Sequence, residues 1–121
     1  QSGKTQLAIG GHLQPLWLAN TGFRNLPRIK GISLGVTQDA HYEKKEISLA
    51  PGESILLFTD GVIEAENEDK ELFGNERLVG FLRDSNGPPW GKGLLEFISN
   101  WRGNSSANDD LTILEIWRDE N

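Results

Sequence analysis

The run Ser54-Ile55-Leu56-Leu57-Phe58-Thr59 is apolar on both of its alternating faces. This pattern is typical of a strand that is buried in the middle of a packed sheet. The turn signal Pro51-Gly52 precedes the run, and Asp60-Gly61 ends it. A second mostly apolar run, residues 111–117, lies near the end of the chain and predicts another strand of the same kind.

The first half of the chain predicts shorter strands. Residues 5–10 and 15–19 have strand patterns on either side of a turn-rich break of hairpin size, and residues 42–49 predict a further strand. Residues 20–36 are rich in Gly, Pro and Arg and have no clear period, so we expect a loop with at most one short strand, ending in the segment 31–36.

Two helices are predicted between the strands at 54–59 and 111–117. Leu78, Phe81 and Leu82 have helical spacing, which predicts an amphipathic helix over 75–84 with Asn75 as its cap. A second helix is expected over 92–101, and its apolar stripe consists of Leu94, Leu95, Phe97, Ile98 and Trp101. This order of elements suggests an α+β fold with helices packed on one face of an antiparallel sheet.

Composition limits the function classes. The chain has 121 residues, of which 36% are hydrophobic, so we expect one domain. A net charge of −6 argues against nucleic acid as a partner. There is no Cys, which excludes disulfides, thiolate nucleophiles and zinc ribbons. We expect no membrane span and no signal peptide. There is no Met either, so we expect a processed chain or a piece of a longer one.

Acidic residues gather where two predicted strands end and begin. Asp60 follows the strand at 54–59, and Asp109 and Asp110 precede the strand at 111–117. If these strands are neighbours, the carboxylates face each other, and a divalent cation would relieve both their repulsion and their loss of hydration. Oxygen ligands select Mg²⁺ or Mn²⁺. Gly61 would let the chain turn sharply and leave the Asp60 carboxylate open to water.

Other readings of the polar residues stay open or fail. Asp-Gly is a common turn pair and Asp-Asp a common loop pair, so spacing alone is also consistent with plain solvated loops. The acidic stretch from Asp60 lacks the alternation and the glycine of a calcium-binding loop. With only His12 and His41, a serine-type triad finds no support. We interpret His12 as a turn residue that forms a local hydrogen bond, and His41 as a surface residue.

Six segments, in order, resemble bacterial metal-dependent serine/threonine phosphatases of the SpoIIE/RsbU type, in the PPM superfamily. The strongest are Thr59-Asp60-Gly61-Val62-Ile63-Glu64-Ala65 and Leu72-Phe73-Gly74-Asn75-Glu76-Arg77-Leu78, which are similar to the "TDGv-E-A" and "fG-erL" signatures. The others are Ala8 to Leu16 ("aNAGHpPpl"), Gly31 to Val36 ("G-pLGv"), Leu49 to Glu53 ("L-pGD") and Asp109 to Leu114 ("DD-Tll"). The resemblance runs from about Leu7 to Trp117.

The resemblance implies a β-sandwich flanked by helices, with two Mn²⁺ or Mg²⁺ ions that activate water to attack phosphoserine or phosphothreonine. By position, Asp60 and Asp109 match metal-ligating aspartates, and Asp110 and Gly61 lie beside them. Thr59 and Thr112 are expected either to orient these carboxylates or simply to pack as strand residues. The implied substrate is a phosphorylated regulator of the anti-sigma-factor antagonist kind, in a bacterial cytoplasm, and a sensor or receiver domain could precede the chain.

The chain also departs from the family pattern. The family domain carries, in its first half, a Gly-Asp motif whose aspartate bridges the metals, and that half is absent here. We therefore expect residues 1–121 to be the C-terminal half of the domain, inactive alone, with exposed sheet edges that favour a homodimer. The alternatives are a non-catalytic partner-binding module (a pseudophosphatase) and a cation-binding domain without hydrolysis.

Overall fold

The computed structural model describes residues 2–105 and 110–120, which form two antiparallel sheets and two helices. The larger sheet has the strand order β3-β2-β5-β6. Its strands are β3 (Gly22–Arg24), β2 (Leu16–Ala19), β5 (Ser54–Phe58) and β6 (Ile113–Trp117). The predicted buried strand, β5, therefore lies inside the sheet, between β2 and β6.

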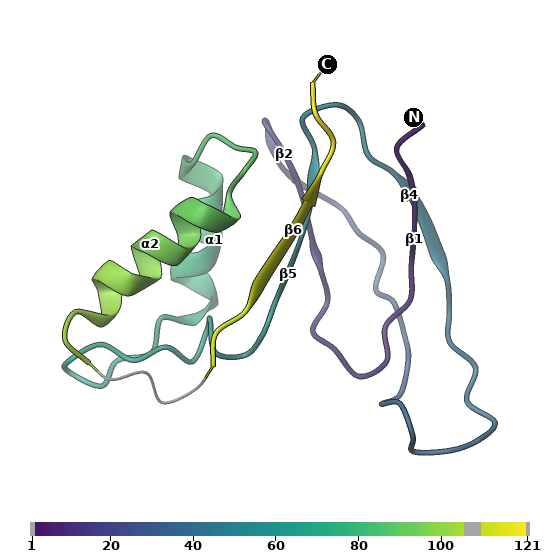
Figure 1. The fold of residues 1–121 in the computed structure, drawn as a ribbon, viewed down its shortest axis with the longest axis horizontal. Helices are drawn as coiled ribbons and strands as arrows, with labels where there is room; N and C mark the ends of the chain where they lie inside the picture. The colour runs from purple at the N-terminus through teal and green to yellow at the C-terminus, as the bar shows by residue number, and fades with distance from the viewer. Residues whose placement is uncertain (1, 106–109, 121) are drawn as a thin grey trace.

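The smaller sheet pairs β1 (Lys4–Leu7) with β4 (Lys45–Ser48). It packs against one face of the larger sheet, while α1 (Gly74–Asp84) and α2 (Gly91–Arg102) pack against the other (Figure 1). The described residues thus form three layers, in the order helices, four-stranded sheet and two-stranded sheet. This arrangement confirms the expected α+β class with helices on one face of an antiparallel sheet.

The two faces of β5 fill two separate cores, as its apolar pattern predicts. Leu56 and Phe58 point toward the helices, where they join the larger core with Phe73 and residues of α1 and α2. Ile55 packs on the opposite face with Ile47 and Leu49, which lie in and just after β4. A strand with apolar residues on both faces is required because each face is covered by a different layer.

The helices agree with their predicted positions to within one residue at each end, although their details differ. Asn75 lies inside the first turn of α1 and not at its cap, which is Phe73, so the predicted cap is wrong. In α2, Leu94 and Ile98 are buried, but Leu95 is 51% exposed and Phe97 41% exposed. Only part of the predicted apolar stripe therefore contacts the core.

The first half of the chain contains the errors of strand assignment. The strands on either side of the Gly10-Gly11 break do not form a hairpin, because β1 pairs with β4 and β2 with β3 and β5. No strand forms in residues 31–36, and the short strand of the preceding segment is β3, formed by residues 22–24. The described helices include none that is long and apolar enough to cross a membrane.

Candidate metal centre

The candidate site lies where β5 ends and β6 begins. The two strands are antiparallel neighbours, with Phe58 opposite Ile113. Beyond this pair the backbone N–H of Thr59 donates to the carbonyl oxygen of Thr112 at 3.1 Å. The N–H of Thr112 donates in turn to Oγ1 of Thr59 at 3.0 Å. The neighbouring strands that the sequence argument required are therefore present, and the threonines tie their ends together.

Asp60 directly follows Thr59, and Asp110 lies two residues before Thr112, so the two acids lie just beyond the tied ends. Both residues are exposed. The predicted loss of hydration at the strand ends is therefore absent for these two carboxylates, and burial does not force either to pair with a cation. Asp109, the other predicted ligand, lies outside the described residues.

Gly61 allows the segment after β5 to approach the segment before β6 closely at this end of the sheet. It is buried, and a Cβ at this position would overlap the carbonyl oxygen of Asp110. After Gly61 the chain turns, with the N–H of Val62 bonded to the carbonyl of Thr59 and that of Glu64 bonded to the carbonyl of Asp60. The sharp turn is as predicted, and the close approach to Asp110 adds a second reason for a glycine.

The ligand atoms at this end of the sheet are of the kind that a hard divalent cation prefers. Too few ligating side chains lie together there among the described residues, however, to hold a metal ion. Asp60 and Asp110 offer carboxylate oxygens, which Mg²⁺ and Mn²⁺ prefer. Within residues 2–105 and 110–120, however, no three acidic, His or Cys side chains cluster closely enough to hold a metal ion. The residues fit a metal centre only as part of its ligand set.

His12 and His41 have the structural roles predicted for them, and neither belongs to the candidate metal ligands. Nδ1 of His12 is hydrogen-bonded at 2.8 Å to the carbonyl oxygen of Leu13 in the turn after β1. His41 is exposed. In the acidic stretch, Asn67 shapes the turn, because its Oδ1 accepts hydrogen bonds from the N–H groups of Asp69 and Glu71. The end of that stretch, residues 68–71, is thus an exposed turn.

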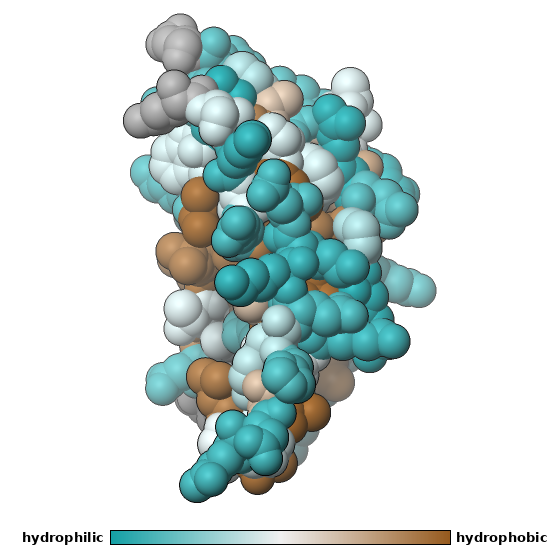
Figure 2. Space-filling model, turned by 90° about the vertical axis from the view of Figure 1, so that its right-hand side faces the viewer, coloured by the Kyte–Doolittle hydropathy of each residue, from teal (hydrophilic) through white to brown (hydrophobic). Residues whose placement is uncertain are grey.

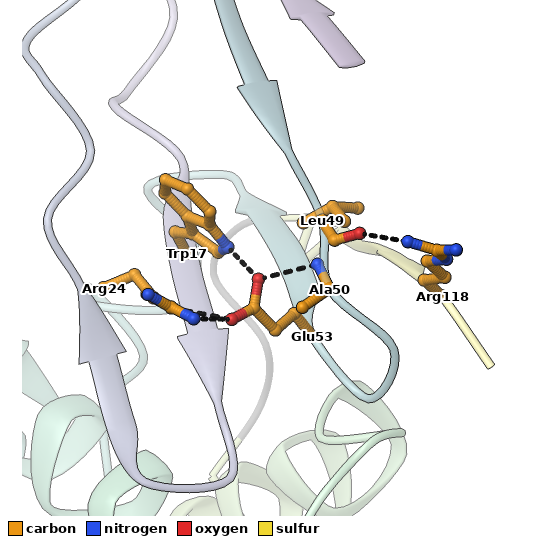
Figure 3. Close-up of polar contacts among 6 residues, drawn as sticks. All are labelled: Trp17, Arg24, Leu49, Ala50, Glu53 and Arg118. Atoms are coloured by element: carbon orange, nitrogen blue, oxygen red, sulfur yellow. Dashed lines mark hydrogen bonds and ion pairs between the residues drawn. The ribbon is translucent and has the colours of Figure 1, made fainter. Parts of the chain in front are cut away.

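Glu53 is a buried acid whose role the sequence analysis missed. Its carboxylate accepts hydrogen bonds from Nε1 of Trp17 at 3.0 Å, the N–H of Ala50 at 3.0 Å and Nε of Arg24 at 2.6 Å (Figure 3). Burial alone would raise the pKa of Glu53, but these hydrogen bonds and the charge of Arg24 outweigh it and lower the pKa below its ordinary value. Glu53 therefore holds the start of β5 to β2 and β3.

Glu115 is the second missed acid, and it lies in the middle of β6. Its carboxylate accepts hydrogen bonds from Oγ of Ser54 at 2.7 Å and from the N–H groups of Trp90 at 3.0 Å and Gly91 at 2.8 Å. Glu115, in β6, thus caps the N-terminus of α2. The unpaired N–H groups and the positive end of the helix dipole at that N-terminus favour a negatively charged group such as this carboxylate. A single acid within an otherwise apolar strand was the available signal.

Comparisons with known proteins show which family and which solved structures this chain is similar to. A family model described as Stage II sporulation protein E (SpoIIE) matches residues 1–119. Among curated proteins, Protein IcfG of Synechocystis is 28% identical over 82 residues, which cover 67% of this chain and 13% of IcfG. Among solved structures, the SiaA-PP2C domain of Pseudomonas aeruginosa is 27% identical, with a TM-score of 0.66, over 94% of this chain and 46% of that one.

The phosphatase domain of the Bacillus subtilis cell fate determinant SpoIIE shares the fold at lower identity. A structure of this domain with a fragment of the regulatory domain has a TM-score of 0.74 at 15% identity, over all of this chain and 36% of that one. A structure of the phosphatase domain described as Mn presoaked also matches, with a TM-score of 0.56 at 15% identity. The chain spans less than half the length of IcfG, of the SiaA domain and of the SpoIIE chain with the regulatory fragment.

Proposed function

The chain belongs to the SpoIIE family, and we propose that it supplies the C-terminal half of a metal-dependent protein serine/threonine phosphatase domain. The observation that supports this proposal best is the pairing of β5 with β6. It brings the Thr59-Asp60-Gly61 motif and Asp110 to one edge of one sheet. The family match over residues 1–119 and the PP2C-like fold are consistent with it.

In this proposal Asp60 and Asp109 are metal ligands, while Asp110 and Gly61 support them. Two bound Mn²⁺ or Mg²⁺ ions would supply a hydroxide at neutral pH and a positive clamp for phosphoryl oxygens. This chain's own residues hold the ligands in place. The Thr59–Thr112 hydrogen bonds fix the separation of the two strand ends, and the turn after Gly61 directs the chain away from the site.

The proposed substrate is a phosphoserine or phosphothreonine on a bacterial cytoplasmic regulatory protein, such as an anti-sigma-factor antagonist. The relatives support a signalling role, since the SpoIIE structure contains a phosphatase domain joined to a fragment of a regulatory domain. An upstream sensor or receiver domain in a longer parent protein belongs to the same proposal. We further propose that the missing ligand comes from a Gly-Asp motif in the N-terminal half, so residues 1–121 alone would be inactive.

The test compares hydrolysis of a phosphoserine peptide by the 121-residue chain and by an extended form that carries the N-terminal half before Gln1. With Mn²⁺, we expect turnover from the extended form only. Asp60→Asn or Asp109→Asn should abolish it, as should EDTA. Asp69→Asn is the matched control, because Asp69 lies in the same acidic stretch but on the surface turn that Asn67 organises.

The outcomes separate this proposal from its alternatives. An extended form that folds, binds no Mn²⁺ and hydrolyses no peptide would favour a non-catalytic partner-binding module. An extended form that binds Mn²⁺ through Asp60 without hydrolysis would favour a plain cation-binding domain. Mn²⁺-dependent turnover by the 121-residue monomer, lost in Asp60→Asn, would overturn the proposed incompleteness of the chain.

A further inference from the structure

Residues 61–73 form an arm that folds back on itself between β5 and α1. Within the arm, the N–H of Phe73 donates to the carbonyl of Ala65 at 2.7 Å. Both of these residues are buried and belong to the core beneath the helices. At the tip of the arm, Oδ1 of Asn67 accepts a hydrogen bond from the N–H of Asp69 at 3.0 Å. The arm is therefore an ordered element that is fixed to the core.

Glu68 lies at the tip of the arm and contacts the end of α2. Its Oε1 accepts a hydrogen bond from the backbone N–H of Asn104 at 3.0 Å. Gly103, which follows α2, leaves room for this carboxylate, because a Cβ at Gly103 would lie 3.3 Å from Oε1 of Glu68. Figure 1 shows the arm passing beside the end of α2. Glu68 thus joins the arm to the start of the segment that leads from α2 to β6.

Arg77, in α1, makes a second link between the arm and α2. Its Nη1 donates to the carbonyl oxygens of Leu72 and Phe73, at 3.0 and 3.1 Å. Its guanidinium lies over the ring of Trp101, 3.9 Å from the centroid, which is a favourable cation–π contact. Trp101 comes two residues before Gly103, so both links hold the same end of α2.

The segment between α2 and β6 is held to the region after β5 at both of its described ends. At its start, Asn104 is bonded to Glu68, and at its other end the carbonyl oxygen of Asp110 lies against Gly61. By sequence, the same segment carries Asp110 and the proposed ligand Asp109. Fixing a segment in advance lowers the conformational entropy that is lost when a ligand binds.

We propose that Glu68 is a positioning residue of the metal centre, because it fixes the start of the segment that carries Asp109 and Asp110. The inference rests on the proposed function, since it concerns the ligands of that same site. Glu68 acts as a hydrogen-bond acceptor and not through its charge. The C-terminus of a helix carries a partial negative charge, which does not favour a carboxylate there, whereas the oxygen atom satisfies the N–H of Asn104.

The test measures the Mn²⁺ dependence of phosphoserine-peptide hydrolysis by the extended form carrying Glu68→Ala or Glu68→Gln. Alanine removes the acceptor, so the Mn²⁺ concentration for half-maximal turnover should rise by about threefold to tenfold. KM for the peptide should stay the same, because Glu68 acts through the metal ligands. Glutamine removes the charge but keeps an acceptor, so Glu68→Gln should behave like the unaltered extended form.

Two control variants remove a carboxylate elsewhere. Asp69→Ala alters the neighbouring residue and keeps the N–H that bonds to Asn67. Glu46→Ala alters an exposed residue of β4, which lies on the other face of the larger sheet from the arm. Figure 2 looks onto that side of the molecule, where hydrophilic side chains predominate. Because exposed charges are screened, neither control should change the Mn²⁺ dependence by more than about twofold.

Hydrogen exchange of the 121-residue chain tests the anchoring without any catalysis. The N–H of Thr112 bonds to Oγ1 of Thr59, so its exchange rate reports on the far end of the segment. In Glu68→Ala, the N–H groups of Asn104 and Thr112 should exchange faster, by about threefold to tenfold. The N–H of Leu94, within α2, should keep its rate. In Glu68→Gln all three rates should match those of the unaltered chain.

Three results would overturn the inference. The first is a Glu68→Ala variant with unchanged Mn²⁺ dependence or unchanged exchange at Thr112. The second is a Glu68→Gln variant that is as impaired as Glu68→Ala, since the charge would then be what matters. The third is an equal loss in Asp69→Ala.

The two measurements also separate this inference from the proposed function. If the extended form shows no Mn²⁺-dependent turnover while exchange at Thr112 depends on Glu68, the proposed function fails and the placement of the segment by Glu68 stands. If the extended form is active and exchange at Thr112 does not depend on Glu68, only the present inference fails. If neither effect is seen, both fail.

Discussion

The N–H of Thr112 donates a hydrogen bond to the side-chain Oγ1 of Thr59 at 3.0 Å, while the N–H of Thr59 donates to the carbonyl of Thr112 at 3.1 Å. This reciprocal pair extends the ladder between β5 and β6 beyond the last strand residues. It sets the distance between two segments of the chain, one that continues into Asp60 and one that begins at Asp110, two residues before Thr112. The threonine hydroxyl thus links the packed sheet to the candidate metal centre.

Thr59→Val should therefore weaken both the fold and the site. The substitution keeps the β-branched shape but removes the acceptor of the Thr112 N–H. Because that N–H can reach water, we expect a loss of only about 0.5–1.5 kcal/mol in the free energy of unfolding, measured with urea. In the extended form, peptide hydrolysis should also fall. Thr59→Ser retains the hydroxyl acceptor, so it should keep most of the stability and most of the hydrolytic activity. Equal losses in Thr59→Val and Thr59→Ser would contradict the role of the hydroxyl.

Gly61→Ala should separate the ends of β5 and β6. The new Cβ would overlap the carbonyl oxygen of Asp110, which is backbone and cannot rotate away. Overpacking of this kind costs about 1–3 kcal/mol, and urea unfolding would measure it. Asp110 should shift with its carbonyl, so the extended form should also bind Mn²⁺ more weakly in calorimetry.

Gly80→Ala provides the matched glycine control. Gly80 lies within α1, and a Cβ there would meet nothing within 4 Å outside the helix's own backbone. Alanine favours helix over glycine by about 1 kcal/mol, so this variant should be more stable than the unaltered chain. A Gly61→Ala variant as stable as Gly80→Ala would contradict the close approach at Asp110.

Glu115→Ala should destabilise the packing of α2 on the sheet. It removes the acceptor for three donors, Ser54 Oγ and the N–H groups of Trp90 and Gly91, of which Ser54 is fully buried and Trp90 is 3% exposed. Leaving buried donors unsatisfied costs about 1–3 kcal/mol, and we expect a loss in the upper part of this range in chemical denaturation. Glu96→Ala, an exposed position on the same helix, should change stability by less than about 0.5 kcal/mol.

The sequence predicts well those features that depend on local pattern. The apolar run of β5 is buried on both faces, and each helix begins and ends within one residue of its prediction. The pairing of β5 with β6 was a condition of the metal hypothesis, and the structure shows it. Local pattern suffices here because both strands are nearly continuous apolar runs bounded by polar residues.

Features that depend on distant partners were not predictable in this way. β1 pairs with β4, about 40 residues later, so the intervening turn signals wrongly suggested a hairpin with β2. β3 has only three residues and no detectable period. Glu53 and Glu115 are charged residues next to or within apolar strands, and their partners, such as Arg24 and Gly91, are distant in sequence. Only the folded chain reveals what compensates each charge.

Glu53 should make the stability of the chain depend on pH. Burial raises its pKa, but the hydrogen bonds from Ala50, Arg24 and Trp17, together with the charge of Arg24, lower it further than burial raises it, so that the pKa in the folded chain lies below the ordinary value of 4.5. The ionised form is therefore favoured by folding. Its contribution is fully present above about pH 4.5 and is lost as the pH falls through the lowered pKa.

Glu53→Gln isolates this contribution, because glutamine keeps the shape and an acceptor but carries no charge at any pH. At neutral pH we expect the variant to be less stable by about 1–3 kcal/mol, since the bonds to Arg24 lose their charge assistance. As the pH falls below 4.5, the protonated Glu53 comes to resemble glutamine, and the difference in unfolding free energy should shrink. Urea unfolding of both chains between neutral and acidic pH would measure it. A difference that stays constant, or grows, in acid would show that the carboxylate stabilises the fold through shape alone, and that its charge is not what joins β5 to β2 and β3.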